Sequence, residues 1–64
     1  MIDIEKASDI LFSADKREAG KLREYALNFI VKNFDAVSKT KSFETLVRRD
    51  VELTLEILRR RQES

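Results

Sequence analysis

The sequence predicts an all-α protein made of antiparallel helical hairpins, with about four helices in a small bundle or stacked array. Two observations support this fold class. The 64 residues contain no proline and one glycine, so little interrupts helix formation. Apolar residues from Ala14 to Phe43 recur mainly three or four positions apart, which places them along one face of a helix. A chain of this length forms one thin domain at most.

The first helix is expected over residues 4–15, with Asp3 as its N-cap. Its apolar residues form one buried stripe: Ile4, Ala7, Ile10, Leu11 and Ala14. The polar segment 16–19 follows, and we expect Gly20 to relieve the backbone at the turn.

The second helix is expected over residues 21–33, followed by one further turn over residues 35–38 and a short helical turn after Ser42. Its stripe carries Leu22, Tyr25, Ala26, Phe29, Ile30 and Phe34, while Lys21, Arg23, Glu24, Asn28 and Lys32 face water. The predicted core motif of the chain is Ala14, Leu22, Ala26, Phe29, Ile30, Phe34, Val37 and Phe43.

The last helix is expected to begin after Asp50 as N-cap and to end near Arg61. It carries two apolar stripes about 160° apart at 100° per residue. One stripe is Val51, Leu55 and Leu58, and the other is Leu53 and Ile57. One stripe can pack on the core of the domain and leave the other to a protein partner, so the candidate self-association residues are Leu53, Ile57 and Leu58. Alternatively, the helix inserts between neighbours and buries both stripes.

The residue types argue against an enzyme. The chain has neither histidine nor cysteine, so the usual zinc, thiol and Ser-His chemistries are excluded. Glu52 and Glu56 lie four positions apart on the last helix, and we interpret them as a solvated face. There is no glycine-rich phosphate loop. We expect no catalytic residue, no metal and no cofactor.

Charge is abundant but balanced, with 13 basic and 12 acidic residues and a net charge of +1. The best candidate patch for nucleic acid is the set Arg48, Arg49, Arg59, Arg60 and Arg61. A helix C-terminus and ordinary solvation account for this set, so we expect no nucleic-acid partner. Glu52 and Glu56 interrupt the basic face that anionic lipid requires, so we expect no membrane partner either.

The N-terminal sequence MIDIEKASD has neither the basic nor the apolar region of a signal peptide. The longest apolar runs are three residues, far below the roughly 20 needed to span a membrane. The absence of cysteine fits an intracellular protein. We therefore expect a soluble protein of the cytoplasm or nucleus.

One set of spaced positions is shared with a known family: Ala14-Asp15, Leu22, Ala26, Phe29-Ile30, Phe34, Val37, Thr40, Phe43 and Leu46. This pattern resembles the BACK domain, the helical module that follows BTB/POZ domains, and most of all its version in speckle-type POZ and related adaptor proteins. The resemblance covers residues 4–46 and fades over residues 47–64. There, Val47-Arg48-Arg49-Asp50 stands where many kelch-type relatives carry Ser-Pro.

The resemblance implies a non-catalytic scaffolding module in a substrate adaptor of a cullin-type E3 ubiquitin ligase. It also implies a homodimer or higher oligomer, with Leu58 at a matching position of the final helix. On this basis residues 1–64 are expected to be a single BACK-like domain from the C-terminal part of a larger BTB-containing protein. Cullin binding is expected only in the full protein, because the BTB domain and the helices just after it make that contact. Two other interpretations remain open: a rigid helical spacer without its own partner, and a small nucleic-acid-binding helical domain.

Overall fold

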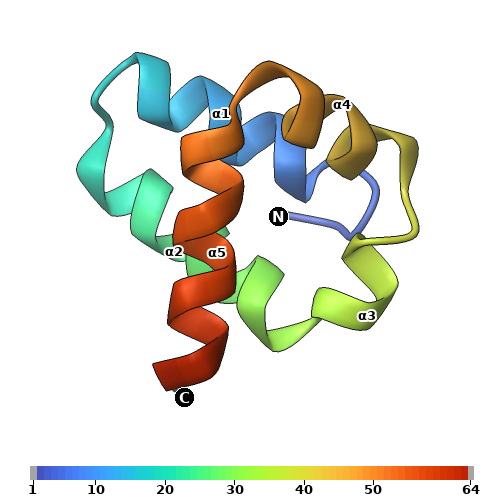
Figure 1. Ribbon diagram of the computed structural model, residues 1–64. Coiled ribbons are helices and arrows are strands. Elements are labelled where there is room, and N and C mark those ends of the chain that lie inside the picture. Colours follow the sequence, from blue (N-terminus) through green and yellow to red (C-terminus); the bar gives the residue numbers. More distant parts are fainter. Residues whose placement is uncertain (1, 64) are drawn as a thin grey trace.

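The computed structural model describes residues 2–63, which form helices and no strand. Figure 1 shows the helices arranged around a common core, with α5 crossing α2. The elements in chain order are α1 (Ala7–Lys16), α2 (Gly20–Lys32), the single turn α3 (Phe34–Val37), α4 (Lys41–Arg49) and α5 (Val51–Glu63). The all-α prediction is confirmed, with the expected turn before Ser38 forming a short helix of its own.

The connection between α1 and α2 is a helix C-cap centred on Glu18. The amide of Ala19 donates to the carbonyl of Ala14 (2.9 Å) and that of Glu18 to Asp15 (3.3 Å), the pattern of a Schellman motif. Glu18 occupies the left-handed position of this motif, with φ 56°. The expectation that Gly20 relieves this turn is therefore wrong. Gly20 begins α2 and has no positive φ.

Two later helices begin at side-chain caps. Thr40 Oγ1 accepts a hydrogen bond from the Phe43 amide (3.2 Å) at the start of α4. Asp50 Oδ1 accepts one from the Leu53 amide (3.0 Å) at the start of α5, as the sequence predicted. Each cap satisfies an amide that has no partner inside its helix. The α4–α5 boundary is thereby fixed at Asp50.

The first helix begins later than expected, at Ala7 instead of Ile4. Asp3 Oδ1 accepts a hydrogen bond from the Lys6 amide (2.9 Å), so this residue caps a turn that precedes α1. Ser42 Oγ of α4 donates to the carbonyl of Glu5 and ties this N-terminal segment down. Ile2 is buried in the core as a result.

The core lies between α1, α2, α4 and α5. Of the predicted core motif, five residues are buried: Ala14, Ala26, Ile30, Val37 and Phe43. Phe29 and Phe34 are half-buried and pack against the core. The prediction that Leu22 belongs to the core is wrong, because this residue is 47% exposed. The buried face of α2 instead follows Ala26, Leu27 and Ile30, and this rotation turns Leu22 outward.

Candidate self-association surface

Helix α5 presents one apolar stripe to the core and the other to solvent. Leu53 and Ile57 are 4% and 0% exposed, and they belong to the core cluster. Val51 is 60% exposed, Leu55 is 41% exposed, and Leu58 is half-buried. The outer face, defined here as Val51, Leu55 and Leu58, therefore has no covering element along most of its length.

This geometry corrects two of the three candidate self-association residues. Leu53 and Ile57 cannot contact a partner in this fold because α1, α2 and α4 surround the core to which they belong. Leu58 is the one candidate at the edge of the outer face. Val51 and Leu55, which the candidate set omitted, supply most of the exposed apolar surface of the helix.

Salt bridges join α5 to α2. Arg23 of α2 donates from Nε to Asp15 of α1 (2.8 Å) and from Nη2 to Glu56 of α5. Both hydrogen bonds raise the pKa of Arg23, and the bond to Glu56 has the larger effect. Arg60 of α5 donates to both carboxylate oxygens of Glu24, at 2.6 and 3.3 Å. Glu56 and Arg60 lie one turn apart on α5, and their partners are adjacent residues of α2, so both pairs join the two helices where they cross.

The two ends of α5 are held as well. At its start, Thr54 Oγ1 donates to the Asp50 carbonyl (3.1 Å), and Lys16 lies 3.9 Å from the Asp50 carboxylate. Near its end, the Arg61 guanidinium lies over the Phe34 ring, 4.3 Å from the centroid. α5 is therefore attached to its own chain at its start, along α2 and near its end.

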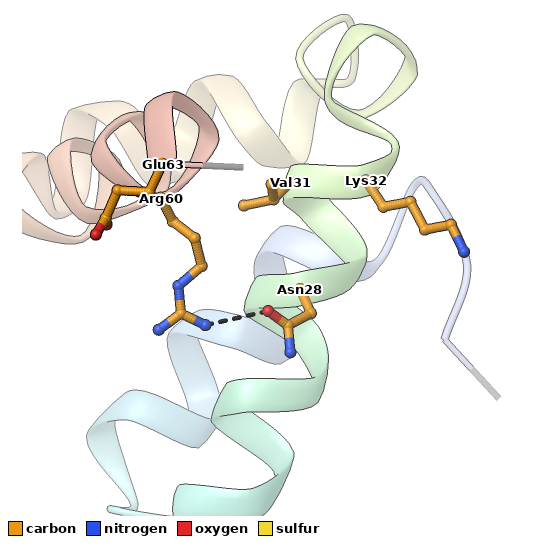
Figure 2. Close-up of a pocket in the computed structure, with 5 residues that line it drawn as sticks. All are labelled: Asn28, Val31, Lys32, Arg60 and Glu63. Atoms are coloured by element: carbon orange, nitrogen blue, oxygen red, sulfur yellow. Dashed lines mark hydrogen bonds between the residues drawn. The ribbon is translucent and has the colours of Figure 1, made fainter.

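A surface depression lies between α2 and α5. Figure 2 shows Arg60 pointing toward Asn28, with Nη1 donating to Oδ1 at 3.1 Å, while Lys32 points away. Val31 and Glu63 complete the lining. The Arg60 guanidinium in this depression is already bound to Glu24 and Asn28, so it serves to join α5 to α2.

The basic residues that formed the candidate nucleic-acid patch are spread over two helices. Arg48 pairs with Glu44 (2.9 Å), and Arg49 lies 5.9 Å from the centroid of the Phe12 ring. Arg60 and Arg61 make the α2 and Phe34 contacts described above. Most members of the set are thus engaged within the chain.

Within residues 2–63, no group of three or more His, Cys, Asp or Glu side chains is placed to hold a metal ion. Over the same residues, no helix has the length and apolar character required to cross a bilayer.

No family model, curated protein or solved structure matches this chain.

Proposed function

We propose that this chain is a non-catalytic interaction module that self-associates through the outer face of α5. The observation that carries the proposal is the exposure of Val51 and Leu55 on a helix whose other apolar stripe already fills the core. Apolar side chains aligned on one helix face lose contact with water when a second helix covers them.

The size of the outer face indicates a weak complex. Side chains that are only partly exposed contribute less than the roughly 1.5–3 kcal/mol expected for burying a whole aliphatic side chain. Association also carries a cost of at least about 4 kcal/mol in lost translational and rotational freedom. We therefore expect a dissociation constant in the high micromolar range, at the weak end of specific interfaces.

The experiment is sedimentation equilibrium from about 10 μM to 1 mM. Leu55→Asp is expected to raise the dissociation constant at least about tenfold, because it places two charges in the interface of each dimer. Leu22→Asp is the matched control, since Leu22 has similar exposure on α2 and lies outside the outer face. Circular dichroism verifies that both variants keep the helical fold. A wild-type monomer at 1 mM would refute the proposal.

The wider role in a cullin-type ubiquitin ligase stays a prediction that rests on the resemblance of residues 4–46 to BACK domains. The self-association proposal rests on the surface of α5 and does not require that role.

A further inference from the structure

We infer that two copies of this chain pair with their α5 helices antiparallel, and that Glu52 of each copy contacts Arg59 of the other. This inference rests on the proposed self-association and adds the orientation of the two helices. It starts from the charges that border the outer face, because apolar contacts alone do not specify a direction.

Glu52 and Arg59 lie on the same flank of the outer face. At 100° per residue from Val51, Glu52 lies at about 100° and Arg59 at about 80°, while the apolar stripe is centred near 10°. Both side chains are exposed. The ion pairs found over residues 2–63 include neither of them. Together with Leu55 and Glu56 they line one shallow depression on the surface of α5.

In an antiparallel pair, a two-fold axis perpendicular to the helices relates the two copies. Each flank of α5 then lies beside the same flank of the other copy, which runs in the opposite direction. Glu52 and Arg59 lie seven positions apart, about 10 Å along the helix axis. Their midpoint falls beside Leu55, the central residue of the stripe. An antiparallel pair centred on Leu55 therefore brings Glu52 opposite Arg59 of the other copy, twice per dimer.

A parallel pair produces a different set of neighbours. With the two-fold axis along the helices, the Glu52 flank faces the opposite flank of the other copy, which carries Thr54 and Arg61. The side chain of Thr54 is buried and bound to Asp50, and that of Arg61 lies on Phe34. The charges bordering the outer face thus complement each other only in the antiparallel arrangement.

Charge reversal followed by mixing tests the orientation. Sedimentation equilibrium at about 50 mM salt is carried out on Glu52→Arg, on Arg59→Glu and on an equimolar mixture of the two. Each variant alone places like charges opposite each other twice, so its dissociation constant is expected to rise about tenfold. In the mixed dimer both pairs are opposite in sign again, so the mixture is expected to regain wild-type affinity.

A control is needed because the two variants also differ in net charge. Glu44→Arg and Arg48→Glu make the same charge changes on α4, at residues whose mutual ion pair is exposed. Mixing this second pair is expected to give no comparable gain in affinity. At about 0.5 M salt the gain from mixing Glu52→Arg with Arg59→Glu should shrink because exposed charges are screened.

The outcomes separate this inference from the proposal beneath it. If the wild type dimerises and Leu55→Asp abolishes the dimer, but mixing Glu52→Arg with Arg59→Glu restores nothing, the antiparallel orientation is wrong and self-association through α5 stands. If the wild type stays monomeric at 1 mM, both ideas are refuted. Equal gains from the α4 pair and the α5 pair would also overturn the orientation.

Discussion

The guanidinium of Arg23 in α2 donates a hydrogen bond to the carboxylate of Glu56 in α5, across a sequence separation of 33 residues. The same guanidinium holds Asp15 of α1, so one side chain links three helices. This contact lies beside the buried stripe of Leu53 and Ile57, and it therefore favours the rotation of α5 that leaves Val51 and Leu55 exposed.

Removing this link should destabilise the fold. Arg23→Ala leaves Asp15 and Glu56 without their cation, and we expect a loss of about 1–2 kcal/mol in unfolding free energy. Arg48→Ala is the control, since Arg48 is 78% exposed against 24% for Arg23 and pairs only with Glu44 one turn away on the same helix. Its expected loss is about 0.5 kcal/mol or less. Urea unfolding followed by circular dichroism measures both, and equal losses would contradict the linking role of Arg23.

Ser8 in α1 is fully buried, and its hydroxyl has no hydrogen-bond partner among the described residues. Ser8→Ala removes an unsatisfied polar group and adds a better helix former, so we expect a gain of about 1 kcal/mol. For a domain of this size that gain corresponds to a rise of roughly 4–8 °C in melting temperature. Ser13→Ala, at an exposed position of the same helix, should give a smaller rise. A lower melting temperature for Ser8→Ala would show that the hydroxyl stabilises the fold.

Glu18 adopts a left-handed backbone conformation that is unfavourable for a side chain with a Cβ atom. Glu18→Gly removes this strain and adds flexibility to the unfolded chain, for an expected net gain of about 0.5 kcal/mol. Arg17→Gly, one position earlier with φ −89°, adds only the flexibility and should lower the melting temperature. Thermal unfolding of the two variants should therefore give shifts of opposite sign, and a destabilised Glu18→Gly would contradict the prediction.

The pair between Glu24 and Arg60 makes stability depend on pH. The hydrogen bond from Arg60 lowers the pKa of Glu24 below its ordinary value of 4.5. A carboxylate with a lowered pKa in the folded state stabilises the protein above its unfolded pKa, and this contribution is lost as the pH falls through the folded pKa. Glu24→Gln should therefore show a smaller drop in melting temperature between pH 7 and pH 3 than the wild type. Glu5→Gln, at an exposed carboxylate outside the ion pairs described, should keep the wild-type drop.

The helices and several of their ends could be predicted from the sequence because those signals are local. Asp50 caps α5 as expected since the cap requires only a carboxylate three residues before an amide. The turn at Glu18 could not be predicted in this way. Glutamate rarely adopts a left-handed conformation, and the nearby Gly20 offered the more common solution.

The register of the α2 face shows where periodicity becomes ambiguous. Leu22 lies one turn before Ala26, and Leu27 directly follows Ala26. The predicted stripe included Leu22. In the structure Leu27 is buried, and Arg23 lies on that same face at the helical spacing from Ala26 and Leu27. Including Leu27 in the stripe would have placed Arg23 toward the core instead of toward water.

The candidate surface was predicted only in part, for a related reason. Two stripes on α5 followed from spacing alone, but which stripe faces inward depends on packing in the core and on contacts with Arg23 and Glu24, more than 30 positions away in the sequence. No local pattern contains that information. The predicted candidates therefore combined two inward residues, Leu53 and Ile57, with the half-buried Leu58.

The most direct test of self-association through the outer face is an isotope-filtered NMR experiment on an equal mixture of ¹³C-labelled and unlabelled protein near 1 mM. Intermolecular NOEs from the methyl groups of Leu55 to those of Val51, Leu55 or Leu58 in the other copy are the expected result. If intermolecular NOEs are absent at this concentration, or arise only at Leu22 and Tyr25 of α2, the outer face of α5 does not join two copies of this chain.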